Sequence, residues 1–376
     1  MDGRRMADAA SSKPRSGAPD PSFWRSRRVL VTGHTGFKGS WLSLWLQALG
    51  ADVTGYSLEP PTTPSLYEQA GVGRTLRTIT ADIRDYDRLV QVVAEVQPQV
   101  VIHMAAQSVV KRGYADPIET YAVNVMGTVH VLEAVRRLGS PCAFVNVTSD
   151  KCYAHRSSGP GYIETDPMGG DDPYSNSKGC AELVTTAWRQ SYFPSAGIGE
   201  HGVALASARA GNAIGGGDWT PDQLIPDLMR AFAASHPCPI RRPAAIRPWQ
   251  FVLEPLRGYL ILAERLSDDG AAFASGWNFG PVDEDARPVE WIADRLARGW
   301  GESATWVRDE TTHPAEAAVL KLDASKAAAQ LGWKPALPLP EALDWIVEWY
   351  RAWQRHDDIG ALTREQLARY QSRLAA

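Results

Sequence analysis

The chain has 376 residues, of which 44% are hydrophobic and 22% are charged. This balance excludes fibrous, collagen-like and mostly disordered proteins, and the length is sufficient for two domains or one large domain. The net charge of −4, from 39 basic and 43 acidic side chains, gives no positive field over the whole molecule, so we expect neither a nucleic acid nor an anionic membrane as a partner.

Segments that would indicate a membrane, a disulfide framework or a metal are not evident. The chain lacks the run of about 18 to 20 apolar residues that a membrane span needs. Its cysteines, Cys142, Cys152, Cys180 and Cys238, show neither a CxxC pair nor a histidine at metal-ligand spacing, so we expect no metal and a reducing cytoplasm. Residues 1–25 are predicted to be a disordered leader, because they lack the apolar core of a signal peptide.

From Arg28 onward, short β-rich runs alternate with longer helical patterns. Strands are predicted at residues 29–32, 53–56, 76–80, 100–103, 143–148 and 203–209. Helices are predicted at residues 38–49, 86–96, 118–138 and 181–190. This order predicts an α/β fold in which helices cover both faces of a doubly wound parallel sheet.

The composition changes after Asn212, where a run of three glycines is followed by recurring prolines and aromatic residues. We therefore expect residues 26–212 to form the first domain. Residues 213–355 are expected to form mainly a smaller α/β lobe, with some segments returning to the first domain. An amphipathic helix at 340–353 is predicted to pack on this lobe, and residues 356–376 are assigned to a C-terminal tail.

The first glycine-rich turn, Gly33 to Gly39, directly follows a strand and opens a helix. In that context, glycines let the backbone approach the pyrophosphate of a dinucleotide at the positive end of the helix. The GxxGxxG spacing is that of short-chain dehydrogenases and their extended relatives; the alternative is a tight turn with no ligand. Cofactor contacts are predicted at Gly33, Thr35, Gly36, Phe37, Lys38 and Gly39.

Two later segments are weaker candidates for the same cofactor. Asp82 and Ile83 follow the third strand, where a carboxylate can lie beside an adenine amino group, although Asp82 is equally well explained as a helix cap. His103 ends the fourth strand before small residues, and a structural role is the simpler interpretation of this histidine. The second strand ends without an acid for the ribose hydroxyls, so the residues leave NAD and NADP both open.

Tyr174 and Lys178 are four residues apart, so they share one face of a helix. There the ammonium is expected to lower the pKa of the phenol from about 10. Ser149, at the end of a predicted strand, can hydrogen-bond the same substrate oxygen. These three residues predict a base that deprotonates a hydroxyl group.

Asp150 and Lys151 follow Ser149 directly. Simple alcohol oxidation needs neither of them. At the end of a strand the chain turns, so both can face the substrate as an acid and a base. The alternative is a solvated pair at the start of a loop.

Taken together, these motifs resemble the CDP-glucose 4,6-dehydratases, a family of extended short-chain dehydrogenases. In the dTDP-glucose dehydratases, the triplet that corresponds to residues 149–151 resembles Thr-Asp-Glu. Here Lys151 stands at the position of that glutamate, and lysine at this position resembles the CDP-sugar branch. The resemblance extends from Arg28 to Tyr350. It is carried by Gly33 to Trp41, Thr148 to Tyr153, Tyr174 to Lys178, Arg209 to Asn212, Gly215 to Trp219, Arg247 to Gln250, Trp277 to Pro281 and Leu322 to Trp333.

The resemblance implies that CDP-glucose is converted to CDP-4-keto-6-deoxyglucose and water, with a tightly bound NAD that is regenerated in each turnover. Tyr174, assisted by Lys178 and Ser149, would take the proton of the C4 hydroxyl while hydride leaves C4 for the nicotinamide. Lys151 as base and Asp150 as acid would then remove water across C5 and C6, and hydride would return to C6. The division of acid and base roles between Asp150 and Lys151 stays open. The base role needs a neutral lysine and the acid role needs a protonated aspartate, whereas the neighbouring ammonium of Lys151 would favour the ionised aspartate.

The resemblance also implies contacts at a Rossmann-like cofactor site and a substrate site. Further cofactor contacts are Asp82, Ile83, Ala105, Ala106, Gln107, Asn124, Tyr174 and Lys178. Substrate contacts are Gln107, Arg112, Ser149, Asn212 and Arg247, with Arg247 the first choice for the diphosphate and Arg112 the second.

Two other functions are weighed against this one. A 4-epimerase or reductase on the same scaffold would not need Asp150 and Lys151, and a cofactor-sensing regulator would not need Tyr174 and Lys178. A homodimer is expected through helices near residues 124–138 and 181–190. Deoxysugars for surface polysaccharide or a glycosylated metabolite are the expected products of the pathway, which the sequence does not identify.

Overall fold

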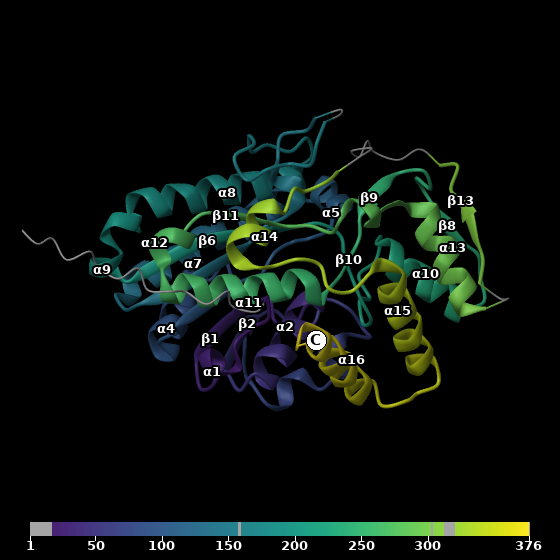
Figure 1. The fold of residues 1–376 in the computed structure, drawn as a ribbon, viewed down its shortest axis with the longest axis horizontal. Coiled ribbons are helices and arrows are strands. Elements are labelled where there is room, and N and C mark those ends of the chain that lie inside the picture. Colours follow the sequence, from purple (N-terminus) through teal and green to yellow (C-terminus); the bar gives the residue numbers. More distant parts are fainter. Residues whose placement is uncertain (1–16, 157–158, 302–303, 312–319, 376) are drawn as a thin grey trace, which may run out of the picture.

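The computed structural model describes residues 17–156, 159–301, 304–311 and 320–375. Its centre is a seven-stranded sheet in which every pair of neighbouring strands is parallel (Figure 1). The strand order is β11 (Gly276–Phe279), β6 (Val203–Ala210), β5 (Cys142–Val147), β4 (Val100–His103), β1 (Arg28–Thr32), β2 (Asp52–Ser57) and β3 (Arg77–Thr80).

Helices cover both faces of this sheet, which confirms the predicted doubly wound fold. Alternate residues of β1 belong to different hydrophobic clusters, with Val29 and Val31 on one face and Leu30 on the other. The first face packs on α2 (Phe37–Ala48) and α11 (Leu253–Asp268). The second face packs on α4 (Tyr86–Val96), α7 (Gly127–Leu138) and part of α8 (Pro173–Ser191).

The predicted helix at residues 118–138 is present as one helical run, made of α6 (Pro117–Tyr121), the π-helical turn η2 (Ala122–Met126) and α7. The elements β11 and α11 were not predicted, and they are among the segments of residues 213–355 that return to the first domain. Both elements are buried. Because a buried segment does not alternate between polar and apolar residues, its sequence does not indicate which element it packs against.

The smaller lobe lies at one end of the sheet (Figure 1). Its helices are α10 (Leu224–Ala233), α13 (Val289–Trp300) and α15 (Leu339–Gln354). Three short strand pairs join them: β7 (Ala213–Ile214) with β10 (Gln250–Phe251), β8 (Cys238–Ile240) with β13 (Trp306–Arg308), and β9 (Ile246–Pro248) with β12 (Ala286–Pro288).

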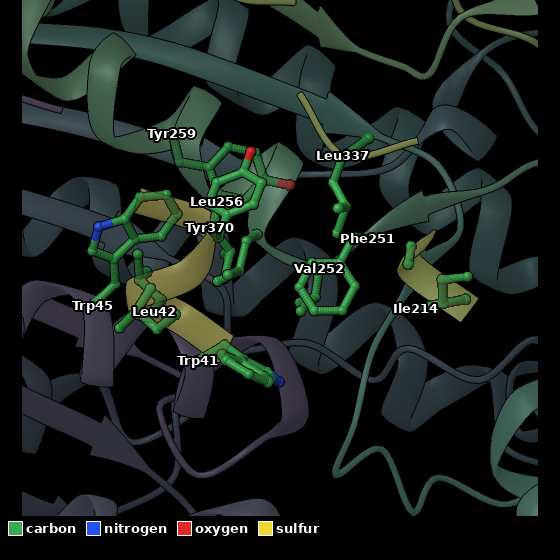
Figure 2. Close-up of a cluster of buried hydrophobic side chains, with 14 of the residues drawn as sticks. Trp41, Leu42, Trp45, Ile214, Phe251, Val252, Leu256, Tyr259, Leu337 and Tyr370 are labelled. Atoms are coloured by element: carbon green, nitrogen blue, oxygen red, sulfur yellow. The ribbon is translucent and has the colours of Figure 1, made fainter. Parts of the chain in front are cut away.

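The predicted C-terminal tail is instead a packed helix, α16 (Ile359–Ala375). Tyr370 is fully buried and meets Trp45 of α2 edge to face, with 5.7 Å between ring centroids. Figure 2 shows these two rings beside Tyr259 and Leu256 of α11. The end of the chain therefore returns to the first domain, where it covers α2.

The predicted disordered leader is also wrong in part. Residues 17–25 are placed, and they include the short helix α1 (Pro21–Trp24). The Trp24 indole is fully buried and donates a 2.7 Å hydrogen bond to Glu264 of α11. Residues 1–16 lie outside the described part of the chain. None of the helices in the described ranges has the length and apolar character needed to cross a membrane.

Candidate active site

The polar residues singled out in the sequence lie where the parallel strands end. The glycine turn follows β1, Ala105 and Gln107 follow β4, Ser149 follows β5, and Asn212 follows β6. Because β1 lies between β2 and β4, the sheet reverses its order there. Ligands of such sheets bind in the crevice outside this reversal.

The glycine turn has the geometry of a pyrophosphate cradle. Gly33 has a φ of 75°, and a Cβ there would lie 2.8 Å from the backbone of Ala105. A Cβ at Gly39 would lie 2.1 Å from the carbonyl oxygen of Gly33. Gly36 caps α2 with no side-chain hydrogen bond, and a Cβ there would meet only that same carbonyl oxygen, at 3.4 Å. The backbone therefore packs closely against its neighbours at Gly33 and Gly39, whereas space remains beside Gly36. This arrangement fits a dinucleotide phosphate at the start of the helix.

The weaker cofactor candidates have clear structural partners. Asp82 accepts from the Arg84 side chain at 2.6 Å and from its backbone N–H at 2.8 Å, and Arg84 lowers the pKa of this carboxyl. The helix cap of α4 is Asp85, so Asp82 does not cap that helix. Ile83 is buried against Gly127. Thr35 hydrogen-bonds Ser57 at the end of β2.

His103 has the structural role given above as the simpler interpretation. Its Nδ1 pairs with Thr32 at 2.7 Å, and its Nε2 lies 3.3 Å from the hydroxyl of Thr128. Burial, together with the ammonium of Lys178, lowers its pKa to about 3. The ring is therefore neutral near pH 7.

Asn124 and Gln107 build the loop that follows β4. Asn124 Oδ1 accepts from the backbone N–H of Gln107 at 2.9 Å, and its amide donates to the Gln107 carbonyl and to Ser177, each at 2.9 Å. The Gln107 side chain bonds Thr120 and the backbone of Val109. Both amides hold the wall of the crevice against α8.

Ser149, Tyr174 and Lys178 come together in the buried crevice. Ser149 precedes the 3₁₀ turn η3 (Asp150–Cys152), and its hydroxyl lies close enough to the phenol of Tyr174 to affect the pKa of that group. Each of the three is at most 8% exposed. Burial, followed by the nearby ammonium of Lys38, lowers the pKa of Lys178 to about 8. The electrostatic expectation for Tyr174 was wrong in direction: burial raises the pKa of its phenol, and the hydrogen bond with Ser149 opposes this rise.

Asp150 is only 3% exposed, and burial raises the pKa of its carboxyl against the opposing effects of Lys151, Ser149 and Arg247. Its Oδ1 accepts from the Ser149 hydroxyl at 3.0 Å. Its Oδ2 is buried and has no hydrogen-bond partner within the described ranges. A Cβ built at Gly211 would lie 2.9 Å from that oxygen. The site therefore contains a carboxyl group that readily holds a proton.

Lys151 is half-buried, and its backbone N–H donates to the Ser149 hydroxyl at 3.2 Å. The turn η3 therefore presents Asp150 and Lys151 from one short segment. Lys38 was expected only as a cofactor contact, but its ammonium donates to the Tyr259 hydroxyl of α11 at 3.1 Å. Burial lowers the pKa of Lys38 to about 8, while Asp150 opposes the shift. Tyr259 was missed in the sequence, because α11 carries no motif that assigns it to the crevice.

The two candidate diphosphate ligands differ in position. Arg247 on β9 is 8% exposed, donates to the carbonyl of Ile246 at 2.9 Å and acts electrostatically on Asp150. The Arg112 side chain, on α5 (Val110–Ala115), is 59% exposed and paired with Glu119 at 2.5 Å. Asn212 directly precedes β7, and its carbonyl oxygen accepts from the backbone N–H of Gln250, the first residue of β10, at 3.1 Å.

Comparisons with known proteins agree with this geometry. A family model described as GDP-mannose 4,6 dehydratase matches residues 30–345. A CDP-glucose 4,6-dehydratase from Salmonella typhimurium is 54% identical over 353 residues, which cover 94% of this chain and 98% of the relative.

Solved structures show the same fold. A dTDP-glucose 4,6-dehydratase from Streptomyces venezuelae, with NAD and TYD bound, has a TM-score of 0.71 at 25% identity and covers 88% of this chain and 98% of its own. A UDP-glucuronic acid 4-epimerase from Bacillus cereus has a TM-score of 0.74 at 20% identity, covering 86% of this chain and 99% of its own. The second likeness concerns the fold alone.

Proposed function

The chain belongs to the GDP-mannose 4,6-dehydratase family, and from that premise we propose that it is an NAD-dependent dehydratase that converts CDP-glucose to CDP-4-keto-6-deoxyglucose and water. The relative that is 54% identical is a CDP-glucose 4,6-dehydratase. The observation that carries the proposal is the buried Asp150, which accepts a hydrogen bond from the Ser149 hydroxyl and whose carboxyl has a raised pKa because of burial. Oxidation alone does not need that acid.

The cofactor would be held by the open glycine turn and by the small residues that follow β4. Gly36 leaves room for the pyrophosphate at the start of α2, and Ala105 and Ala106 let the dinucleotide lie close to the sheet. NAD held there would supply the hydride acceptor for C4 of the sugar and the hydride donor for C6. Lys178 and Tyr174 would border the same cofactor.

Tyr174 would take the proton of the C4 hydroxyl, with Ser149 hydrogen-bonded to the same oxygen. Burial makes the phenolate costly, so the base acts only when the lysine ammonium and the serine hydroxyl stabilise the negative charge. The ketone formed at C4 makes the proton at C5 acidic. This step prepares the elimination.

Asp150 and Lys151 would then remove water. Lys151, acting as the base, would accept the C5 proton, and Asp150 would donate a proton to the departing C6 hydroxyl, so that water leaves and a C5–C6 double bond forms. When hydride is added to C6, Lys151 would return a proton to C5. The raised pKa of Asp150 supports its role as the acid. This assigns the acid role to Asp150 and leaves the base role to Lys151.

Arg247 would hold the diphosphate, because its guanidinium is buried near Asp150 and can pair with phosphate oxygens in two places. Asn212 would contact the sugar from the end of β6. Arg112 is paired with Glu119 on the surface, so we place it second.

One assay tests the proposed function. Purified protein is incubated separately with CDP-, dTDP-, UDP- and GDP-glucose, and the products are identified by mass. We expect loss of water from CDP-glucose alone. The Lys151→Met variant should form NADH from the substrate but release no deoxysugar. A product isomeric with the substrate would indicate an epimerase instead, and full turnover by Lys151→Met would remove Lys151 from the mechanism.

We also propose a homodimer that works in the cytoplasm and supplies deoxysugars for polysaccharide. The helices expected at the dimer interface carry exposed apolar side chains, with Met126 47% exposed and Leu183 59% exposed. The four cysteines are free thiols, which suits a reducing compartment. Sedimentation should give twice the chain mass for the wild type and a smaller species for Leu183→Glu; a monomeric wild type would contradict the dimer.

A further inference from the structure

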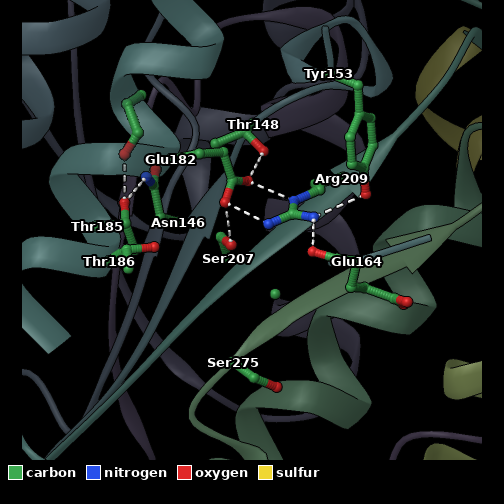
Figure 3. Close-up of polar contacts among 12 residues, drawn as sticks. Asn146, Thr148, Tyr153, Glu164, Glu182, Thr185, Thr186, Ser207, Arg209 and Ser275 are labelled. Carbon is green, nitrogen blue, oxygen red and sulfur yellow. Dashed lines mark hydrogen bonds and ion pairs between the residues drawn. The ribbon is translucent and has the colours of Figure 1, made fainter. Parts of the chain in front are cut away.

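A buried ion pair joins α8 to β6 beneath the catalytic residues. The carboxylate of Glu182 is 1% exposed and the guanidinium of Arg209 is 5% exposed. Arg209 binds both carboxylate oxygens, through Nε at 2.9 Å and Nη2 at 2.8 Å. Thr148 donates to Oε1 at 2.5 Å and Ser207 donates to Oε2 at 2.7 Å. Figure 3 shows these four donors converging on one carboxylate.

The carboxylate lies between the two segments that carry the proposed catalytic residues. Glu182 follows Tyr174 by eight residues and Lys178 by four, so the three share one face of α8. Thr148 immediately precedes Ser149. The hydrogen bond from Thr148 to Glu182 therefore links the segment that carries the serine to the helix that carries the tyrosine.

Arg209 extends the same network to the chain that leaves the η3 turn. Its Nη1 donates to the Tyr153 hydroxyl at 2.7 Å and to the Glu164 carbonyl at 3.0 Å. Tyr153 in turn donates to Asn278 of β11 at 2.6 Å. A Cβ at Gly276 would lie 2.5 Å from Arg209 Nη2, so a side chain there would displace the guanidinium from its present position. Asp150 and Lys151 are thus held from both ends of their segment.

Stability alone is a weak reason for this arrangement. The desolvation of two buried charges offsets much of their attraction, and well-packed apolar residues often stabilise such a site equally well. A fully hydrogen-bonded pair does, however, fix the distance and orientation of the elements that it joins. The carboxylate also favours the ammonium form of Lys178.

We propose that Glu182 is a positioning residue that holds the end of β5 against α8 and so aligns Ser149 with Tyr174 for oxidation at C4. The inference rests on the proposed function, since it concerns the same reaction. It assigns a role to a carboxylate that lies outside the predicted catalytic set. Thr148 is the contact through which the alignment is transmitted.

Two neutral substitutions test the proposal without leaving a buried charge unpaired. Thr148→Val removes the hydroxyl next to Ser149, whereas the matched control, Ser207→Ala, removes the other hydroxyl from the same carboxylate. Each leaves Glu182 with three of its four donors. The rate of NADH formation in a single turnover, kcat, KM and the midpoint of thermal unfolding are measured for both, and for Thr148→Ser, which keeps the hydroxyl.

We expect Thr148→Val to lose between about ten-fold and a hundred-fold in the rate of NADH formation, as small misplacements of reacting groups do. Its KM should stay near that of the wild type, and Thr148→Ser should keep the wild-type rate. Ser207→Ala should also keep the wild-type rate, with a thermal midpoint similar to that of Thr148→Val. If Thr148→Val does not fold, Thr148→Ala gives the same comparison.

Equal losses in Thr148→Val and Ser207→Ala, or wild-type rates in both, would overturn the positioning role. Failure of the proposed function has a different signature. A wild-type chain that forms NADH from a nucleotide sugar but never releases water is not a dehydratase, yet the comparison of the two variants still stands. A wild-type chain that reacts with none of the four sugars would contradict both proposals.

Discussion

The hydroxyl of Ser149 donates a 3.0 Å hydrogen bond to the carboxylate of Asp150, its neighbour in the chain. The serine is assigned to the oxidation at C4 and the aspartate to the loss of the C6 hydroxyl. One hydrogen bond therefore joins a side chain proposed to act in the oxidation to a side chain proposed to act in the elimination that follows. The other Asp150 oxygen is buried and has no hydrogen-bond partner within the described ranges, so it can carry the proton that the acid role requires.

Asp150→Asn tests the acid role with almost no change in shape. We expect the variant to keep the oxidation at C4 and to lose the elimination, by roughly a hundred-fold to ten-thousand-fold in turnover. NADH should accumulate after substrate is added and should decay only slowly. An unchanged rate of product release, measured by mass in the same samples, would exclude Asp150 as the acid.

The same variant should change stability in a pH-dependent way. The folded-state pKa of Asp150 lies above its unfolded value, so its contribution to stability is complete at low pH and is lost as the pH rises through the folded pKa. Near neutral pH, Asp150→Asn should unfold at a higher temperature than the wild type, by an amount equivalent to roughly 1.4 kcal/mol for each unit between the two pKa values. The difference should shrink as the pH falls toward about 4. A wild type that is more stable than the variant near neutral pH would contradict the direction of this shift.

The glycine turn offers two substitutions with different consequences. Gly36→Ala places a Cβ on the open side of the turn, 3.4 Å from the nearest protein atom, so the fold should be kept while NAD affinity falls by about ten-fold or more. Gly39→Ala places its Cβ 2.1 Å from a carbonyl oxygen and should cost about 1–3 kcal/mol of stability. Calorimetric titration with NAD and thermal unfolding separate the two effects. Wild-type NAD affinity in Gly36→Ala would place the pyrophosphate elsewhere.

Arg247→Gln should weaken substrate binding. Removal of charged hydrogen bonds to a diphosphate costs about 1.5–3 kcal/mol, so KM and the Kd for CDP should rise by roughly ten- to a hundred-fold. Arg295→Gln is a matched control in the same lobe, because that guanidinium pairs with Asp344 on the surface. A Kd for CDP that is equal in both variants would show that Arg247 does not hold the diphosphate.

The glycine turn and the strands were predictable because their signals are local. The turn needs glycine where backbone atoms approach one another, as Gly33 and Gly39 do, and buried parallel strands read as short apolar runs. By contrast, β11 begins at Gly276, whose carbonyl accepts from Lys326, and contains the polar Asn278, so its place at the edge of the sheet has no periodic signal. Helix α16 was assigned to a tail because the resemblance ends at Tyr350, and the burial of residues such as Tyr370 depends on contacts with distant segments.

The sequence by itself determined the doubly wound fold and the glycine turn, and it predicts a catalytic set of Ser149, Asp150, Lys151, Tyr174 and Lys178. Only the tertiary structure decided the electrostatics of that set, since burial raises the pKa of Asp150 and of Tyr174. It alone also placed Glu182 and Arg209 beneath the site. Burial and contacts between distant segments depend on how the whole chain packs, whereas turn geometry and periodicity depend on residues that are close together in the sequence.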